Sequence, residues 1–214
     1  MENEKKLKKI WWFLNGIYTV TLVYSMYHNL SIGNINGFNM CFVAILSVCA
    51  VPILFKVFHF KPVYEVFILS TVFAYIASLC GSTLGGYGIP FFDKFLHFSS
   101  GILMLCVSIM LYQLLLGRKV LKEEKQVFWV SVNAMNMAIA LCWEFFEYSM
   151  LVFFNNDCIN HYTTGVHDTI TDMLCATVAG ILLTIYMILH KENFFQRTID
   201  KFYDRNIKHK KNLG

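Results

Sequence analysis

Side chains that could bind a metal, five acids and one histidine, form pairs at helical spacing at three places in the sequence. The pairs are Asp93 with His97, Glu144 with Glu147, and Asp168 with Asp172. Residues three or four apart share one face of a helix, so each pair can present two ligands to the same pocket. Carboxylate oxygens with a histidine nitrogen suit a divalent ion such as Mg²⁺, Mn²⁺, Fe²⁺ or Zn²⁺. These six residues are therefore the predicted ligands of a divalent metal whose identity the ligand types leave open.

Two neighbouring residues could complete a reaction at such a metal. A bound metal activates water or polarises a phosphoryl or carbonyl oxygen, which favours hydrolysis or group transfer. In this hypothesis Lys94 holds an anionic group of the substrate, and His167 or a spare carboxylate moves the proton. Plainer interpretations stay open, because Asp93 and Asp168 also suit the start of a helix, and His97 could be a hydrogen-bonded core residue.

The rest of the sequence is typical of a membrane protein. Of the 214 residues, 57% are hydrophobic and 15% are charged, against about 45–50% and about 25% in soluble domains. This composition argues against a soluble globule and against nucleic-acid binding. Six apolar stretches approach the roughly 20 residues that a membrane-spanning helix needs. They predict an all-α polytopic protein with transmembrane helices at 10–27, 38–55, 66–84, 95–116, 127–154 and 169–189.

Three segments are expected along the chain: a basic N-terminus at 1–9, a transmembrane domain at 10–190 and a basic, amphipathic tail at 191–214. Small and polar residues recur at helical spacing in the last four predicted helices. Because small residues let membrane helices approach closely, we expect 66–84, 95–116, 127–154 and 169–189 to form the core. The first two helices are expected to flank it.

The positions of the positive charges predict the orientation. All of the 18 Lys and Arg residues except Lys94 lie before the first helix, in alternate connections or in the tail. Cytoplasmic segments keep an excess of such residues, so both termini are predicted to be cytoplasmic. The acidic pairs then lie at the extracytoplasmic ends of three helices, at one depth. Five acids so close together cannot all stay ionised and unpaired inside a membrane protein.

The seven cysteines include no C-x-x-C pair and lie mostly in apolar stretches, where free cysteine behaves as a small hydrophobe. We interpret them as packing residues. Cys80 and Cys158 could both lie near the outer membrane face, so the sequence leaves open whether they form a disulfide.

Three motifs in the last three predicted helices resemble known membrane proteins. Residues 93–97 (DKFLH) resemble the D-K-x-x-H opening of VanZ-like proteins. Residues 143–147 (WEFFE) and 168–173 (DTITDM), with the later Gly180, are more similar to the uncharacterised YjdF-type inner-membrane family. The VanZ-like pattern has amides at the positions of Glu147 and Asp172, which favours the YjdF-type family. The VanZ-like group is associated with teicoplanin resistance, but the YjdF-type group has no settled activity, so the resemblance implies no catalytic roles.

The leading hypothesis is a multi-pass cell-membrane protein with an outward-facing metal site. As an enzyme it would act on a lipid-linked or envelope substrate, with membrane lipids as its surroundings. One alternative is a proton- or cation-coupled carrier that uses the acids as a relay, although carriers commonly place their site near the membrane midplane. Another is a non-catalytic envelope protein whose acids only fix helix packing. The oligomeric state stays open.

Overall fold

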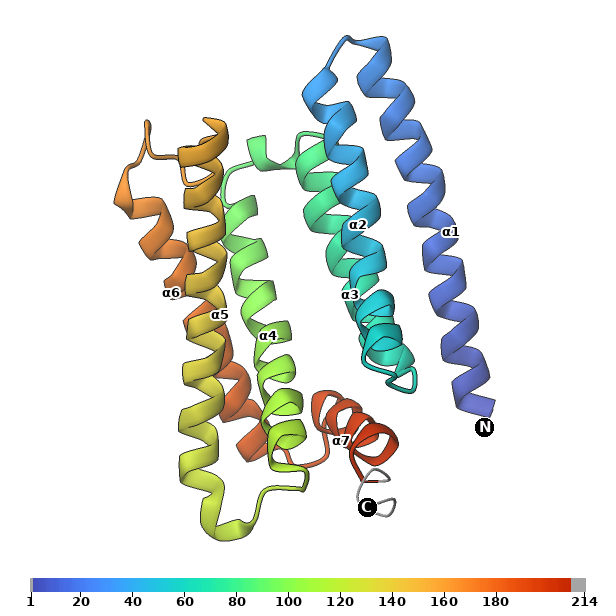
Figure 1. The fold of residues 1–214 in the computed structure, drawn as a ribbon, viewed down its shortest axis with the longest axis vertical. Helices are drawn as coiled ribbons and strands as arrows, with labels where there is room; N and C mark the ends of the chain where they lie inside the picture. Colours follow the sequence, from blue (N-terminus) through green and yellow to red (C-terminus); the bar gives the residue numbers. More distant parts are fainter. Residues whose placement is uncertain (1, 209–214) are drawn as a thin grey trace. The chain divides into compact units, whose positions relative to one another are not determined.

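The computed structural model describes residues 2–208, and these residues form helices joined by short connections, with no β-strand among them. The elements are α1 (Glu2–Ser31), α2 (Ile35–Val57), α3 (Tyr64–Ala74), η1 (Tyr75–Thr83), η2 (Gly86–Gly88), α4 (Phe92–Leu116), η3 (Lys122–Glu124), α5 (Lys125–Phe154), α6 (Val166–Leu189) and α7 (Phe194–Asn206) (Figure 1). The all-α prediction is confirmed for this part of the chain. A π-helix, η1, continues α3 without a break.

Five of the described helices are long and apolar enough to cross a membrane: α2, α3 with η1, α4, η3 with α5, and α6. Four of them begin and end within three residues of their predicted bounds, and the fifth ends at its predicted residue but begins, with η3, five residues early at Lys122. The stretch predicted at 10–27 lies inside the longer helix α1, which is not one of the five because Trp, Tyr, Thr and Asn interrupt its apolar residues. Several membrane crossings are therefore supported, while the sixth crossing and the orientation of the termini stay predictions.

The chain divides into two compact units, Met1–Phe92 and Asp93–Gly214. In the first unit, α1, α2 and the α3–η1 helix pack on one another, and buried polar side chains join them. Ser25 Oγ donates a hydrogen bond to Thr83 Oγ1 at 2.7 Å, and Tyr18 Oη donates to the carbonyl oxygen of Ala44 at 2.8 Å. Such bonds between helices are common in membrane proteins. The third helix thus packs with the first two, and its predicted place in a core with the last three stays a prediction.

The second unit holds α4, α5 and α6, and small residues bring α4 and α6 together. A Cβ atom built on Gly101 would meet the Cα of Ala176 at 2.7 Å and its carbonyl carbon at 2.8 Å, so the two backbones touch. The helices run in the same direction (Figure 1). Residues four before each contact residue, His97 and Asp172, therefore lie at one level, as do Asp93 and Asp168 one turn earlier.

Polar contacts tie α5 to α6 deeper in the second unit. Asn136 Nδ2 donates to the carbonyl oxygen of Ala176 at 3.2 Å, and Asn133 Nδ2 donates to Thr184 Oγ1 at 2.8 Å. Gly180 leaves the space that the Asn136 amide fills, since a Cβ at residue 180 would overlap Asn136 Nδ2. This packing fixes the rotation of α5 and directs Glu144, which lies two turns beyond Asn136, into the unit.

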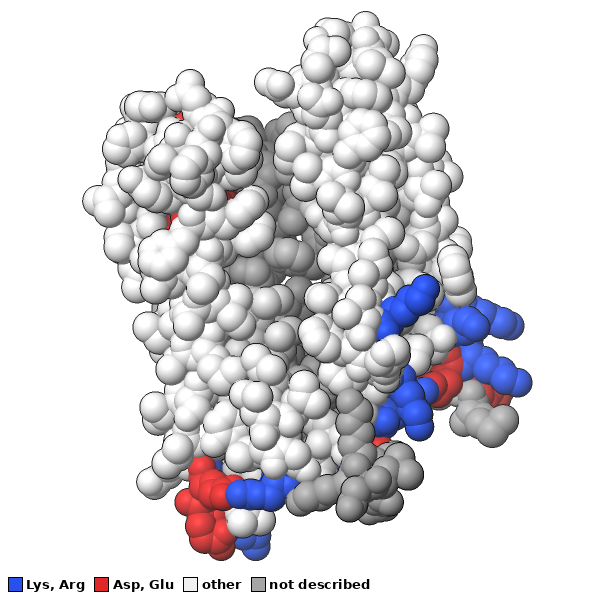
Figure 2. Space-filling view, in the orientation of Figure 1, with Lys and Arg blue, Asp and Glu red and all other residues white. Residues whose placement is uncertain are grey.

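The connection between α4 and α5 carries charges that pair with one another and with α7. Arg118 binds both carboxylate oxygens of Glu124, and Lys119 Nζ binds Asp200 of α7 and lies 5.3 Å from the centre of the Tyr203 ring. In the face drawn in Figure 2, this end of the second unit shows blue and red surface, and at its opposite end only small red areas appear between uncharged side chains.

All seven cysteines are free, so Cys80 and Cys158 are both thiols in this structure. Burial raises the pKa of the Cys158 thiol, and the charges of Glu147 and Asp157 raise it further. A thiol with a raised pKa stays protonated at neutral pH and is a poor metal ligand.

Candidate metal centre

All six predicted ligands and Lys94 come together in the second unit, and we call these seven residues the acid cluster. The first two turns of α4 and α6 supply Asp93, Lys94, His97, Asp168 and Asp172, and α5 supplies Glu144 and Glu147. The three pairs therefore meet as their helical spacing predicts. The residues meet because the start of α4, the start of α6 and the last third of α5 lie at the same end of the second unit.

His97 lies at the centre of the acid cluster. Its Nε2 atom is 3.6 Å from Asp93 Oδ1 and 3.8 Å from Asp172 Oδ1, and its Nδ1 atom is 4.0 Å from Glu144 Oε1. These distances exceed a hydrogen bond. Two ligands bound about 2.1 Å from one ion lie roughly 3.0–3.4 Å apart at bond angles of 90–109°. A small contraction would therefore let His97 share an ion with the carboxylates on either side.

Lys94 binds the aspartates on one side of the acid cluster. Its Nζ atom is 2.5 Å from Asp168 Oδ1, 2.7 Å from Asp172 Oδ1 and 3.5 Å from Asp93 Oδ2. Asp168 is further held through Oδ2 by Asn160 Nδ2 at 2.7 Å. The Lys94 ammonium, which is itself part of the acid cluster, therefore neutralises part of the charge of the three aspartates. The predicted role of Lys94 in holding a substrate anion would require it to leave these carboxylates.

Glu144 is the least compensated member of the acid cluster. Its side chain is 3% exposed, and neither of its carboxylate oxygens accepts a hydrogen bond of normal geometry from the described residues, although the Thr169 hydroxyl lies nearby. Asp172 is equally buried but is bound by Lys94. Burying an ionised carboxylate without a partner costs several kcal/mol, roughly, in a protein interior. A cation or a proton at this position would remove that cost.

The ligand atoms fall into two overlapping groups that could each hold an ion. One group is Asp93, His97 and Asp172, and the other is His97, Glu144 and Glu147; within each group the ligand atoms lie within 4.8 Å of one another. His97 belongs to both groups. Each group offers the mixture of carboxylate oxygens and imidazole nitrogen that divalent ions accept.

A comparison with known protein families identifies the family of this chain. Residues 10–193 match the family described as predicted membrane protein (DUF2238). The chain belongs to the DUF2238 family. The resemblance to YjdF-type proteins is confirmed at the level of this uncharacterised membrane-protein family, whereas similarity to VanZ-like proteins is not shown. Searches of the curated proteins and of the solved structures found no match.

In this DUF2238 protein, two polar contacts of the acid cluster have no counterpart in the sequence prediction. Trp143 Nε1 donates a hydrogen bond to Glu147 Oε1 at 2.9 Å, and Asn160 binds Asp168 as described above. The spacing of four between Trp143 and Glu147 is a signal that could have identified the first contact. Asn160 comes from the polar connection between α5 and α6, whose conformation the sequence does not fix.

His167, the predicted proton-transfer residue, is exposed at the start of α6. Its backbone carbonyl accepts a hydrogen bond from Thr171 Oγ1. The ion pairs described in the acid cluster do not include the His167 ring. Successive residues of a helix point about 100° apart, so Asp168 faces inward and its neighbour does not. The catalytic role of His167 stays a prediction that this geometry does not favour.

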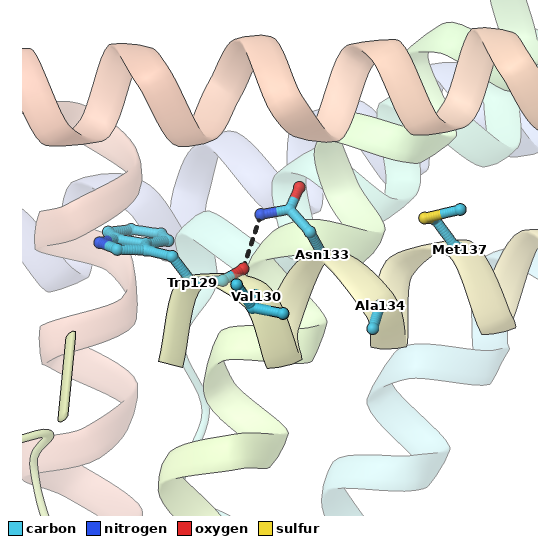
Figure 3. A pocket seen from close by; sticks show the side chains of 5 residues that line it. All are labelled: Trp129, Val130, Asn133, Ala134 and Met137. Atoms are coloured by element: carbon cyan, nitrogen blue, oxygen red, sulfur yellow. Dashed lines mark hydrogen bonds between the residues drawn. The ribbon is translucent and has the colours of Figure 1, made fainter. Parts of the chain in front are cut away.

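A separate hollow of about 440 Å³ lies on α5, lined by Trp129, Val130, Asn133, Ala134 and Met137 (Figure 3). Asn133 donates to the carbonyl oxygen of Trp129 and points toward α6. The lining contains no ionisable side chain, so this hollow has no chemistry of the kind that the acid cluster offers.

Proposed function

We propose that this DUF2238 protein binds a divalent metal ion in the acid cluster and uses it for hydrolysis or group transfer on a lipid-linked or envelope substrate. The observation that carries the proposal is the buried Glu144 carboxylate, which faces His97 and accepts no hydrogen bond of normal geometry from the described residues. Three further acids lie around the same imidazole. A metal ion would satisfy the carboxylate oxygens and His97 together, which a single proton on Glu144 would not.

The charge of the acid cluster supports a cation. Five carboxylates face one ammonium, that of Lys94, so four negative charges remain if His97 is neutral and all the acids are ionised. Ionisable groups in a membrane protein pair with one another or mark a functional path. Divalent ions are often the largest local charge in such a site and keep neighbouring carboxylates ionised.

The position of the acid cluster along its helices supports an extracytoplasmic site. Glu144 lies 19 residues after Lys125 on α5, a rise of about 28 Å, which is close to the roughly 30 Å thickness of the hydrocarbon core. The Lys and Arg residues of the α4–α5 connection lie at the other end of the same helices. If that basic end is cytoplasmic, as the charge pattern predicts, the acid cluster lies at the outer membrane boundary.

Substrate would approach the acid cluster through its more exposed edge. The side chains of Asp93 and Lys94 are 30% and 26% exposed, whereas Glu144 and Asp172 are buried. A phosphoryl or carbonyl oxygen entering beside Asp93 would meet the metal, and water bound to the metal would be the nucleophile. An ionised carboxylate that is not bound to the metal would accept the proton of that water.

The proposal is tested by measuring the metal in purified protein. The full chain, purified in detergent without added chelator, is expected to carry divalent metal by elemental mass spectrometry. Glu144→Gln keeps the shape of the side chain, removes its charge and should lose that metal. Glu123→Gln changes an exposed acid in η3, just before α5 and far from the acid cluster; it is the matched control and should retain the metal. A metal-free wild type, or unchanged metal in Glu144→Gln, would contradict the proposal.

A carrier remains the second candidate because unpaired polar atoms continue beyond the acid cluster. Asn136 Oδ1 and Gln113 Oε1 are buried in the second unit without hydrogen-bond partners among the described residues. Such groups can line a path for ions or protons. Metal- or proton-dependent flux into proteoliposomes, abolished by Asn136→Leu, would favour a carrier. A lipid-linked species that accumulates in deletion cells, with no flux, would favour the enzyme.

A further inference from the structure

The two ring nitrogens of His97 face different carboxylates. Nε2 faces Asp93 and Asp172 at 3.6 and 3.8 Å, and Nδ1 faces Glu144 at 4.0 Å. The lone pairs of an imidazole ring diverge, so one ion cannot use both nitrogens. A ring that has released its N–H proton to solvent can bind one ion through each nitrogen.

We infer that the acid cluster holds two divalent ions on opposite sides of His97, an inference that rests on the metal binding proposed above. One ion would be bound by Glu144, Glu147 and Nδ1, and the other by Asp93, Asp172 and Nε2. A single divalent ion would leave at least two of the cluster's negative charges unbalanced. Two ions bring the acid cluster within one charge of neutrality, whether or not His97 keeps its ring proton.

The two positions differ because Lys94 occupies only one of them. Asp172 Oδ1, a ligand of the second ion, lies 2.7 Å from Lys94 Nζ. An ion there must displace the ammonium or share Asp172 with it. On the other side, Glu144 accepts no hydrogen bond of normal geometry and has only the neutral Thr169 hydroxyl nearby, and Glu147 receives its described hydrogen bond from Trp143, a neutral donor. The glutamate position therefore binds more tightly, and Lys94 sets the occupancy of the aspartate position.

Stoichiometry decides between one ion and two. The full chain in detergent is stripped with a chelator, returned to MnCl₂ by equilibrium dialysis and analysed for manganese. Wild type is expected to bind two Mn²⁺ ions with affinities at least tenfold apart. Asp93→Asn and Glu147→Gln, isosteric changes at partly exposed positions, should each bind one. Glu123→Gln, outside the acid cluster, should bind two.

The outcomes separate this inference from the proposed function. One ion in wild type, or loss of all manganese in Asp93→Asn or Glu147→Gln, would overturn the two-ion arrangement and leave a single-ion site standing. No manganese in wild type would contradict both the two-ion arrangement and the proposed metal binding.

The role of Lys94 has its own test. Lys94→Met should tighten the weaker site at least tenfold, because the competing ammonium is gone, and Lys94→Arg should not. An equal or weaker affinity in a folded Lys94→Met protein would refute the competition. If Lys94→Met does not fold, the affinities of the two sites in wild type still decide, since equal affinities would show that Lys94 does not compete.

Discussion

Position 101 cannot hold a side chain without a shift of the backbone, because the Cα of Gly101 faces the backbone of α6. An alanine Cβ at this position would lie 2.7 Å from the Cα of Ala176, and it would come closer still to the Ala176 carbonyl oxygen. Carbon atoms in contact are about 3.5–4.0 Å apart, so Gly101→Ala must separate α4 and α6 by about 1 Å. Overpacking of this kind costs about 1–3 kcal/mol of folding stability.

The same displacement reaches the acid cluster one turn away. His97 Nε2 and Asp172 Oδ1 are 3.8 Å apart, and a shift of about 1 Å on this axis would take them beyond the ~4.2 Å that separates two ligands on opposite sides of one ion with ~2.1 Å bonds. Gly101→Ala is thus expected to lower the melting temperature in detergent and to lose metal from the aspartate side of the acid cluster.

Gly16→Ala is the matched control for this substitution. No atom lies within 4 Å of a Cβ built at Gly16 on α1, so alanine there should be neutral or stabilise the helix by up to about 1 kcal/mol. Thermal unfolding and elemental analysis of the two variants give both readouts. If Gly101→Ala retained the wild-type melting temperature and metal content, the claim that this contact positions the ligands would be refuted.

Three further predictions follow from other contacts. Gly180→Ala should push aside the Asn136 amide and cost about 1 kcal/mol, and it should cost less in an Asn136→Ala background; equal costs in the two backgrounds would contradict the contact. Chelation with EDTA should lower the melting temperature of wild type but hardly that of Glu144→Gln, and an equal fall in both would show that the stabilising ion lies elsewhere. Burial lowers the pKa of Lys119, but its hydrogen bond to Asp200 and the charges of Asp200, Asp204 and Tyr203 together outweigh burial and raise that pKa overall. The stabilisation is therefore present at neutral pH and is lost as the pH rises through the raised pKa. Because the pair is about half exposed, Asp200→Asn should cost less than about 1 kcal/mol at neutral pH, and melting curves should show the difference from wild type shrinking at alkaline pH.

The positions of the membrane helices could be predicted because hydropathy and length constrain them directly. The bounds of the five apolar helices fall within three residues of expectation, except that η3 starts the fifth one five residues early at Lys122. Helix α1 extends to Glu2 because the charged residues before the apolar stretch are themselves good helix formers. The π-helix η1 had no signal in the sequence. Its last residue, Thr83, accepts hydrogen bonds from Ser25 and Asn29 of α1, so the packing partner is part of what defines its geometry.

The acid cluster could be predicted as a group but not in its pairings. Spacing of three or four residues places each pair on one helix face, and alternating helix directions bring the three ends to one level. Which carboxylate Lys94 binds depends on how α4 and α6 are rotated. That rotation is set by the backbone contact of Gly101 with Ala176, and no local sequence pattern predicts this contact. The same rotation turns Asp168 inward and leaves His167 exposed.

Lys94 connects the charge pattern of the sequence with the chemistry of the acid cluster. It is the one Lys or Arg residue that the sequence predicts on the outer side, an apparent exception to the rule that positive charges stay cytoplasmic. Its ammonium lies within 3.5 Å of oxygens from three carboxylates, so it adds no net positive charge to that side. Lys94 is therefore better understood as part of the acid cluster than as a topological signal, and the remaining charges support cytoplasmic termini without exception. The same three contacts explain why the proposed cation would matter most beside Glu144, which Lys94 does not reach with a described hydrogen bond or ion pair.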